Sequence, residues 1–212
     1  ATGEIYAAAS MPLFDPTKLD DVKEGATNLR GITNAFEPGS VFKTVTAMAA
    51  LEADIVSPED EFDCPARLQA DEYYVSDSHA RDDATFTFRE IINKSSNVGI
   101  SLVAEKLGFT NLYNKIIEYG LNEMTGVDYF GEASGYLLER DYWSLVQGYN
   151  VSFGQGVSVT PVQLCRFYGA INNNGLAYQP HFLMVYPQTG ERPQYRSQQI
   201  IQNTEAIPVM DS

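Results

Sequence analysis

The 212-residue sequence has little of what several classes of protein require. Its two cysteines, Cys64 and Cys165, are too few for a disulfide framework and lack the spacing of metal ligands. We expect Cys165, which lies in an apolar helical stretch, to be a buried structural thiol. The two histidines, His79 and His181, also lack ligand-spaced neighbours. We therefore expect no metal site, and no motif points to a cofactor.

Positive charge is scarce as well. Lysine and arginine together number 14 against 28 aspartates and glutamates, which gives a formal net charge of −14. Because phosphate binding needs a basic patch, this balance argues against a nucleic-acid partner. The sequence also has no run of about 18 apolar residues that would span a membrane, and no basic leader of a signal peptide. The hydrophobic content of 44% is enough for a core and predicts one domain.

The most informative feature present is the tetrapeptide Ser40-Val41-Phe42-Lys43. In the first turn of a helix, positions i and i+3 are neighbours, so hydroxyl and amine share one face. A serine hydroxyl needs a base to become a nucleophile, and a lysine can serve if burial keeps it neutral. The segment from Val41 to Leu51 is apolar nearly all round, which predicts a buried helix and a depressed pKa for Lys43.

Taken alone, this spacing is more typical of an N-cap serine followed by a surface lysine. A second string, Ser95-Ser96-Asn97, changes that balance. It follows a capping-box signal that begins at Thr87 and precedes a predicted helix from Val98 to Leu107. The Ser-x-Asn string is therefore predicted at the junction of two helices, where side chains can point into a cleft. Ser-x-x-Lys with Ser-x-Asn is two of the three signatures of penicillin-recognising serine enzymes.

Further strings extend the resemblance along nearly the whole chain, in one order. With these motifs, the sequence resembles the transpeptidase domain of class B penicillin-binding proteins, in particular the cell-division and sporulation branch. The strings are Thr2-Gly3-Glu4-Ile5-Tyr6-Ala7, Phe36-Glu37-Pro38-Gly39-Ser40, Thr125-Gly126-Val127-Asp128 with Gly131-Glu132, and the run from Ser152-Phe153-Gly154-Gln155-Gly156 to Gln163.

The resemblance implies an α+β fold like that of the penicillin-binding proteins and serine β-lactamases, with residues 1–212 forming a partial transpeptidase domain. It also implies a peptidoglycan D,D-transpeptidase that forms peptide cross-links through a serine acyl-enzyme and is acylated by β-lactams. Ser40 would be the nucleophile, Lys43 the general base, and Ser95 a proton relay. Asn97 would orient the substrate and Lys43. The implied substrates are stem peptides ending in D-Ala-D-Ala.

The family further implies a membrane glycosyltransferase and other cell-wall assembly proteins as partners. It places such enzymes at the extracytoplasmic face of the cytoplasmic membrane, held by an N-terminal anchor that would precede this chain. These are expectations from the resemblance alone.

The family's third signature, Lys-Thr-Gly or Lys-Ser-Gly, is absent. The nearest string, Gln188-Thr189-Gly190, lies between flanks at 182–186 and 192–195 that predict a hairpin, so we interpret it as a turn. The signature is expected beyond Ser212, which makes the chain look truncated and leaves out most of the antiparallel sheet. We therefore expect a helix-rich structure with exposed apolar helix faces, and weak activity of this chain alone.

Two other functions stay open. A serine β-lactamase or β-lactam sensor shares both motifs, and the string Glu118-Tyr119-Gly120-Leu121-Asn122 resembles a deacylation motif of class A β-lactamases. We expect that match to be a coincidence, since Glu118 falls in the last turn of a helix ended by Gly120. The other alternative is a catalytically inactive scaffold of a cell-wall assembly.

The remaining patterns predict helices joined by short turns. One helix is expected over 110–119, and another begins at Thr160-Pro161 and runs to about Asn172. The stretch from Ser57 to Thr85 is polar and acidic, and we expect it to be irregular. A triad built on His79 or His181 has no support in their surroundings, so both histidines are expected to be structural or surface residues.

Overall fold

The computed structural model describes residues 2–186 and 188–204 and contains mainly helices with a few short strands. The helical segments are 3-10 turns η1 (Leu19–Asp21), η2 (Gly39–Phe42) and η3 (Arg140–Tyr142), and helices α1 (Arg30–Thr33), α2 (Lys43–Glu52), α3 (Phe88–Asn93), α4 (Asn97–Leu107), α5 (Phe109–Glu118), α6 (Leu145–Ser152) and α7 (Pro161–Ile171). The strands are β1 (Glu61–Cys64), β2 (Arg67–Ala70), β3 (Tyr73–Ser76), β4 (Ala84–Thr87), β5 (Tyr136–Leu137), β6 (Val157–Ser158), β7 (Leu176–Tyr178) and β8 (Ser197–Gln199).

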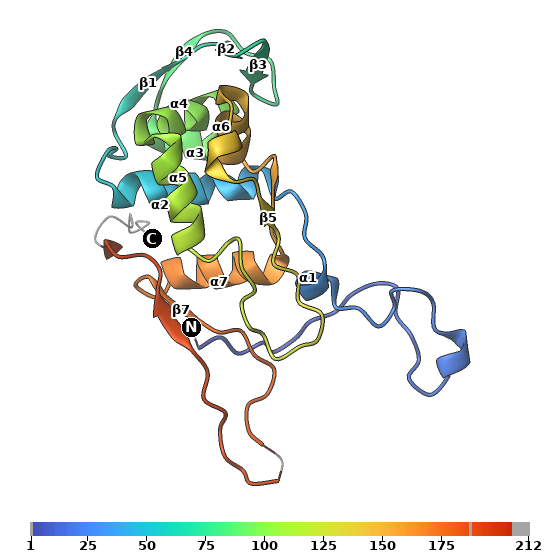
Figure 1. Ribbon diagram of the computed structural model, residues 1–212. Coiled ribbons are helices and arrows are strands. Elements are labelled where there is room, and N and C mark those ends of the chain that lie inside the picture. Colours follow the sequence, from blue (N-terminus) through green and yellow to red (C-terminus); the bar gives the residue numbers. More distant parts are fainter. Residues whose placement is uncertain (1, 187, 205–212) are drawn as a thin grey trace.

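Helix α2 is the centre of the fold. It packs against α3, α4, α5 and α6, and Figure 1 shows it crossing the middle of the molecule between α4 and α7. Its side chains are buried on every side, including Val45, Ala49 and Ala50. The prediction of an all-round apolar, buried helix here is confirmed. A polar side chain on a helix that is buried on all sides needs hydrogen-bond partners within the protein. Lys43, the first residue of α2, is such a side chain.

The helix starts agree with the capping signals in the sequence. Thr87 and Glu90 form a reciprocal capping box at α3, and Thr160 and Gln163 form another at α7, with Pro161 in the first turn. Gly108, with a φ of 85°, separates α4 from α5. These local signals therefore place the helix boundaries to within one or two residues.

The stretch between Ser57 and Thr85 is not irregular, and that prediction is wrong. It contains strands β1 to β4, paired antiparallel as β1 with β4 and β2 with β3, and they arch over α3 and α4 at the top of Figure 1. Each strand is only four residues long, and three of them turn a single side chain fully inward: Cys64, Ala70 and Val75. An alternation of buried and exposed side chains over only four residues is too short to be recognised in a polar sequence.

The predicted turn at Gln188-Thr189-Gly190 is confirmed, since Tyr186 N–H donates to the Glu191 carbonyl and Gly190 N–H to that of Tyr186. The flanking strands lie further out than predicted. Within the described residues, pairing occurs between β7 and β8, at residues 176–178 and 197–199, rather than at 182–186 and 192–195. The long extension at the bottom of Figure 1 is this hairpin. Gln188-Thr189-Gly190 therefore lies at its tip.

Cys165 is exposed, so the prediction of a buried thiol is wrong. Helix α7 turns Phe167 and Ala170 into the core, while Cys165 faces a cavity of about 600 Å³ between α7 and the N-terminal segment. Ile5, Val162 and Pro180 also line this cavity. Among the described residues, none of the helices combines the length and the apolar character needed to cross a bilayer.

The α+β class with a small share of sheet is confirmed. In the described residues, each sheet consists of two strands.

Candidate active site

The turn that precedes α2 brings Ser40 and Lys43 together. Ser40 lies in the 3-10 turn η2, and Lys43 is the first residue of α2. Lys43 Nζ lies 3.1 Å from Ser40 Oγ, within hydrogen-bond distance. The serine is exposed, whereas only 3% of the lysine surface is exposed. The hydroxyl is thus open to a substrate while the amine is shielded from water.

Ser95 reaches the same amine from a distant part of the chain. Lys43 Nζ donates to the Ser95 carbonyl oxygen at 2.6 Å and lies 2.9 Å from Ser95 Oγ. Ser95 lies between α3 and α4, at the helix junction that the sequence predicts. Three oxygens, from Ser40 and Ser95, therefore surround one nitrogen.

Burial sets the charge state of Lys43. Desolvation lowers its pKa from 10.5 to about 8, and the Asp77 carboxylate acts in the opposite direction and raises it. The predicted depression of the pKa of Lys43 is confirmed in direction and cause. At pH 7, about a tenth of the lysine is then neutral, which is far more than for an exposed lysine. Such an amine can accept a proton near neutral pH.

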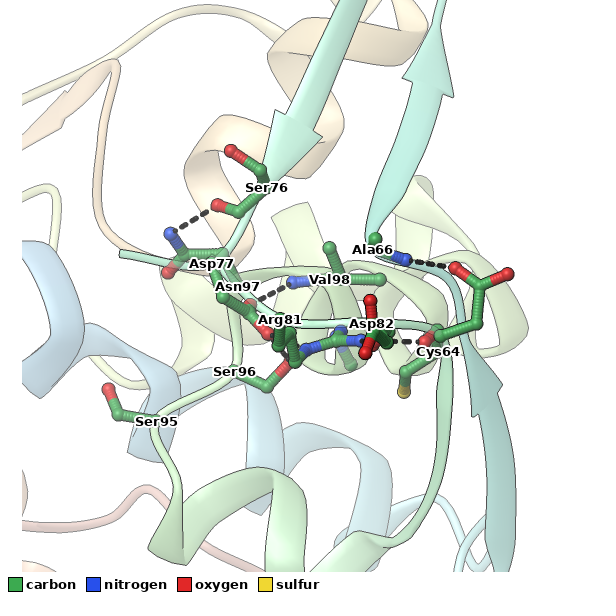
Figure 2. Close-up of polar contacts among 12 residues, drawn as sticks. Cys64, Ala66, Ser76, Asp77, Arg81, Asp82, Ser95, Ser96, Asn97 and Val98 are labelled. Carbon is green, nitrogen blue, oxygen red and sulfur yellow. Dashed lines mark hydrogen bonds and ion pairs between the residues drawn. The ribbon is translucent and has the colours of Figure 1, made fainter. Parts of the chain in front are cut away.

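Ser95 adopts an uncommon backbone conformation, with a φ of 55°. Few residues other than glycine, asparagine and aspartate adopt this left-handed region, and they do so where the surroundings hold them there. Figure 2 shows Ser95 standing apart from a group of polar contacts made by the next three residues. Ser96 caps α4 by accepting a hydrogen bond from Gly99 N–H.

Asn97 is the first residue of α4, and its side-chain amide donates to the Ser76 carbonyl at 3.0 Å (Figure 2). This contact ties the start of α4 to the end of β3. Asn97 therefore anchors the turn in the free protein, while its predicted role toward the substrate and Lys43 stays a prediction.

The residues around the Ser40 turn come from the segment after α6. Gly39 N–H donates to the Gly154 carbonyl at 2.9 Å, and Gly156 N–H donates to the Glu37 carboxylate at 2.9 Å. Phe36 pairs with Val159 in an antiparallel bridge. The sequence string around Gly154 carries the family resemblance, but its spacing does not indicate that it holds the turn of Ser40.

Neither histidine contacts Ser40. His79 is exposed, and His181 is buried, with its ring stacked on Tyr195 at 3.7 Å and Nδ1 3.0 Å from the Gln179 carbonyl. Among the described residues, no cluster of three potential metal ligands occurs. The hydrogen-bond partner of the Ser40 hydroxyl is the Lys43 amine, so a lysine and not an imidazole is placed to act as its base.

Glu118, the last residue of α5, lies near the C-terminal end of α2, whereas Ser40 and Lys43 lie at its N-terminal end. Its carboxylate pairs with Lys115 at 3.0 Å, and Lys115 also pairs with Glu52, the last residue of α2. The two ends of α2 are about 14 Å apart at 1.5 Å per residue. This placement supports the interpretation of the Glu118 string as a coincidence.

A comparison with protein-family models decides the family. Residues 1–207 match the model described as the penicillin-binding protein transpeptidase domain. The chain belongs to the penicillin-binding-protein transpeptidase family.

Curated relatives and solved structures of this family agree with the match. The chain is 33% identical over 182 residues to peptidoglycan D,D-transpeptidase FtsI of Escherichia coli K12, which covers 84% of this chain and 30% of the relative. It is 32% identical over 192 residues to stage V sporulation protein D of Bacillus subtilis, covering 84% and 28%. The crystal structure of penicillin-binding protein 3 from Mycobacterium tuberculosis with ampicillin superposes with a TM-score of 0.84 at 29% identity, covering 97% of this chain and 46% of that chain. The resemblance to the division and sporulation branch is confirmed.

Two other strings typical of the transpeptidase family have structural roles here. The Glu132 carboxylate accepts hydrogen bonds from the backbone N–H groups of Thr125 and Gly126. The Asp128 carboxylate accepts from those of Phe182 and Leu183. The Glu132 carboxylate therefore closes the loop over residues 125–132, and the Asp128 carboxylate ties that loop to the chain that follows β7.

Proposed function

We propose that this chain carries part of the catalytic machinery of a peptidoglycan D,D-transpeptidase. The observation that carries the proposal is the contact of one buried amine, Lys43 Nζ, with the hydroxyls of both Ser40 and Ser95. Because the chain spans 30% or less of the two relatives' lengths, the activity is proposed for the whole protein to which such a chain contributes.

In the first half-reaction, neutral Lys43 takes the proton of Ser40 as its oxygen attacks the carbonyl of the penultimate D-alanine. The tetrahedral intermediate collapses, the C–N bond breaks, and the departing D-alanine amine receives one proton through Lys43 and Ser95. In the second half-reaction, the amine of a neighbouring stem peptide attacks the ester. It gives up one proton, a new amide forms, and Ser40 regains its hydrogen. Asn97 is proposed to orient the peptide.

Ser40 would also be the group that β-lactams acylate. A β-lactam amide would be opened by Ser40 in the same way as the peptide, with its amine retained on the adduct rather than released. We expect this acyl-enzyme to be long-lived. A serine β-lactamase, in contrast, would hydrolyse the adduct rapidly.

The family membership supports a proposal for the partners and the location of the whole protein. We expect the whole protein to act at the outer face of the cytoplasmic membrane, together with a glycosyltransferase that makes the glycan strands. Nothing in a chain with a net charge of −14 favours a nucleic acid.

Covalent labelling tests the proposal. The chain, and the longer natural chain if the gene continues past Ser212, are incubated with a fluorescent penicillin and analysed by intact mass, each beside its Ser40→Ala variant. One β-lactam-sized adduct that is lost in Ser40→Ala is expected. An adduct that disappears within seconds would favour a β-lactamase. A folded, longer chain without an adduct would favour the inactive scaffold.

A further inference from the structure

The carboxylate of Asp77, in the loop that follows β3, gathers several hydrogen bonds (Figure 2). Ser96 Oγ lies 3.0 Å from each of its oxygens, and Val98 N–H donates to Oδ1 at 3.0 Å. Arg81 Nε donates to Oδ2 at 2.7 Å and forms an ion pair with it. A single side chain thus holds the start of α4 by one backbone and one side-chain contact.

The residues that Asp77 holds at α4, Ser96 and Val98, follow directly after Ser95 in the sequence. The residue before Asp77 adds another, because the Ser76 carbonyl accepts the Asn97 amide. Residues 96, 97 and 98 are therefore all fixed to residues 76 and 77. Ser95, whose φ is 55°, is held from its C-terminal side by this clamp and from its N-terminal side by the end of α3. A left-handed serine persists only when its neighbours determine its backbone in this way.

Arg81 is itself fixed, which makes the clamp rigid. Its Nη1 donates to the carbonyls of Cys64 and Asp82, and its guanidinium lies over the ring of Phe86 at 5.0 Å. The side chains of Arg81 and Asp77 are only 19% and 12% exposed. Solvent screens such a pair less than one at the surface.

We propose that the Asp77–Arg81 pair positions Ser95: by fixing residues 96–98, it keeps Ser95 in the left-handed turn that presents both its carbonyl and its hydroxyl to Lys43. This proposal rests on the proposed function of Ser40 and Lys43. Asp77 is a positioning residue, because it acts on the reacting groups through Ser96 and Val98 without touching them.

The charge of Asp77 gives the proposal a second readout. The groups that touch the Lys43 amine, Ser40 from η2 and Ser95 from the α3–α4 turn, are neutral. Among the described residues, Asp77 is the charged group that acts on the Lys43 amine. Its carboxylate is an anion, so it raises the pKa of Lys43. Burial raises the pKa of Asp77 itself, but its bonds to Arg81, Val98 and Ser96 outweigh burial and keep that pKa below its ordinary value. Asp77 is therefore ionised where Lys43 titrates.

Asp77→Asn is the decisive variant, since it keeps the size and one acceptor but removes the charge and the pair with Arg81. We expect acylation by penicillin at high pH to slow about tenfold, as for a partly misaligned base. We also expect the acid limb of the pH–rate profile to move to lower pH, since the anion that favours protonated Lys43 is gone.

Asp83→Asn is the matched control. Asp83 lies in the same loop, and its carboxylate accepts a backbone N–H, that of Ala66, at 2.7 Å. The substitution makes the same change in net charge near the same strands but leaves residues 96–98 untouched. We expect rate and profile to match the wild type. Equal losses in Asp77→Asn and Asp83→Asn, or an acid limb that stays in place in Asp77→Asn, would overturn the proposal.

A titration that needs no acylation separates this proposal from the proposed function. The protein is labelled with 13C-lysine, and the Cε signal of Lys43 is followed by NMR as the pH is changed. The signal is assigned by its loss in Lys43→Gln. A lower titration midpoint in Asp77→Asn, with that of Asp83→Asn unchanged, supports the proposal even where no penicillin adduct forms, a result that would contradict the proposed function alone. An unchanged midpoint in folded Asp77→Asn overturns the Asp77 proposal and leaves Ser40 labelling intact.

Discussion

Two turns meet at Lys43, and they are held by different forces. The turn of Ser40 is held mainly by a backbone hydrogen bond, from Gly39 N–H to the Gly154 carbonyl, and by the full burial of Phe42. The exposed Glu37 carboxylate adds one bond, from Gly156 N–H. The turn of Ser95 is held by a charged side chain, Asp77. The Ser40 side of the site thus depends mainly on close packing, and the Ser95 side depends on a charged side chain and its ion pair.

The difference predicts different weaknesses. A turn fixed by close packing tolerates changes of pH and salt but fails when an atom is added. A turn fixed by a carboxylate tolerates small changes of volume but responds to charge. The reacting groups therefore lie between a steric support and an electrostatic one.

The largest effect is expected from adding one methyl group to the steric support. The Cβ of Gly154→Ala would lie 2.3 Å from the Gly39 carbonyl oxygen and 2.7 Å from the Phe42 Cβ, at a φ of 82°. We expect the free energy of unfolding to fall by about 3–5 kcal/mol and penicillin labelling to be lost. Urea unfolding followed by circular dichroism measures the first, and gel fluorescence the second.

Gly190→Ala is the control for this variant. Gly190 has a similar φ of 72°, but no atom lies within 4 Å of the added Cβ. Only the backbone strain of about 1 kcal/mol is expected. If the two variants were equally stable, the close approach of Gly154 to Gly39 would not be what holds the Ser40 turn.

Next in size is the loss of the second hydroxyl. Ser95→Ala keeps the carbonyl contact to Lys43 but removes the Oγ at 2.9 Å. We expect the acylation rate constant to fall about 100-fold, or about 2.7 kcal/mol, because a proton-transfer group is lost. Stopped-flow measurement with a chromogenic cephalosporin gives this constant. Acylation at the wild-type rate would rule out Ser95 as a relay.

A tenfold effect is expected from pH. Lys43 is protonated below its pKa of about 8 and neutral above it, so acylation that needs the neutral amine rises with pH and levels off beyond pH 8. From pH 7 down to pH 6 the rate constant should fall about tenfold, which corresponds to about 1.4 kcal/mol. A flat profile between pH 6 and 9 in stopped-flow experiments would mean that Lys43 is not the base.

The smallest effect is expected at a secondary contact of the steric support. The Thr46 hydroxyl is fully buried and donates to the Ser152 carbonyl at 2.8 Å. Thr46→Val preserves shape but leaves that carbonyl without this donor, at a cost of about 1 kcal/mol in urea unfolding. Thr85→Val, which removes an exposed bond to Asp63, should change stability by less.

The sequence predicts those parts of the site that depend on neighbours along the chain. Ser40 and Lys43 are three residues apart, so one helical turn brings them together. The helix junction at Ser95 follows from local capping signals. Asp77 and Gly154 are different, because they act through partners about 20 and 115 residues away. Their spacing carries no signal, and four-residue strands such as β3 are too short to show a period.

The same reasoning explains the error at Cys165. In α7, Leu164 precedes this position and Phe167 follows it two residues later, so periodicity alone does not tell which of these side chains faces the core. The tertiary placement of the N-terminal segment decides it, and that segment has few local signals of its own.

The three oxygens around Lys43 Nζ also limit where its protons can be. An ammonium has three N–H groups, one for each oxygen, but a neutral amine has two and a lone pair. The Ser95 carbonyl cannot donate, so the lone pair must face a hydroxyl, either that of Ser40 or that of Ser95. In the first arrangement Ser40 is ready to lose its proton, and in the second Ser95 is. Rotating hydrogens alone converts one arrangement into the other. In this arrangement of oxygens, the proposed transfer of a proton between Ser40 and Ser95 through Lys43 requires no heavy atom to move.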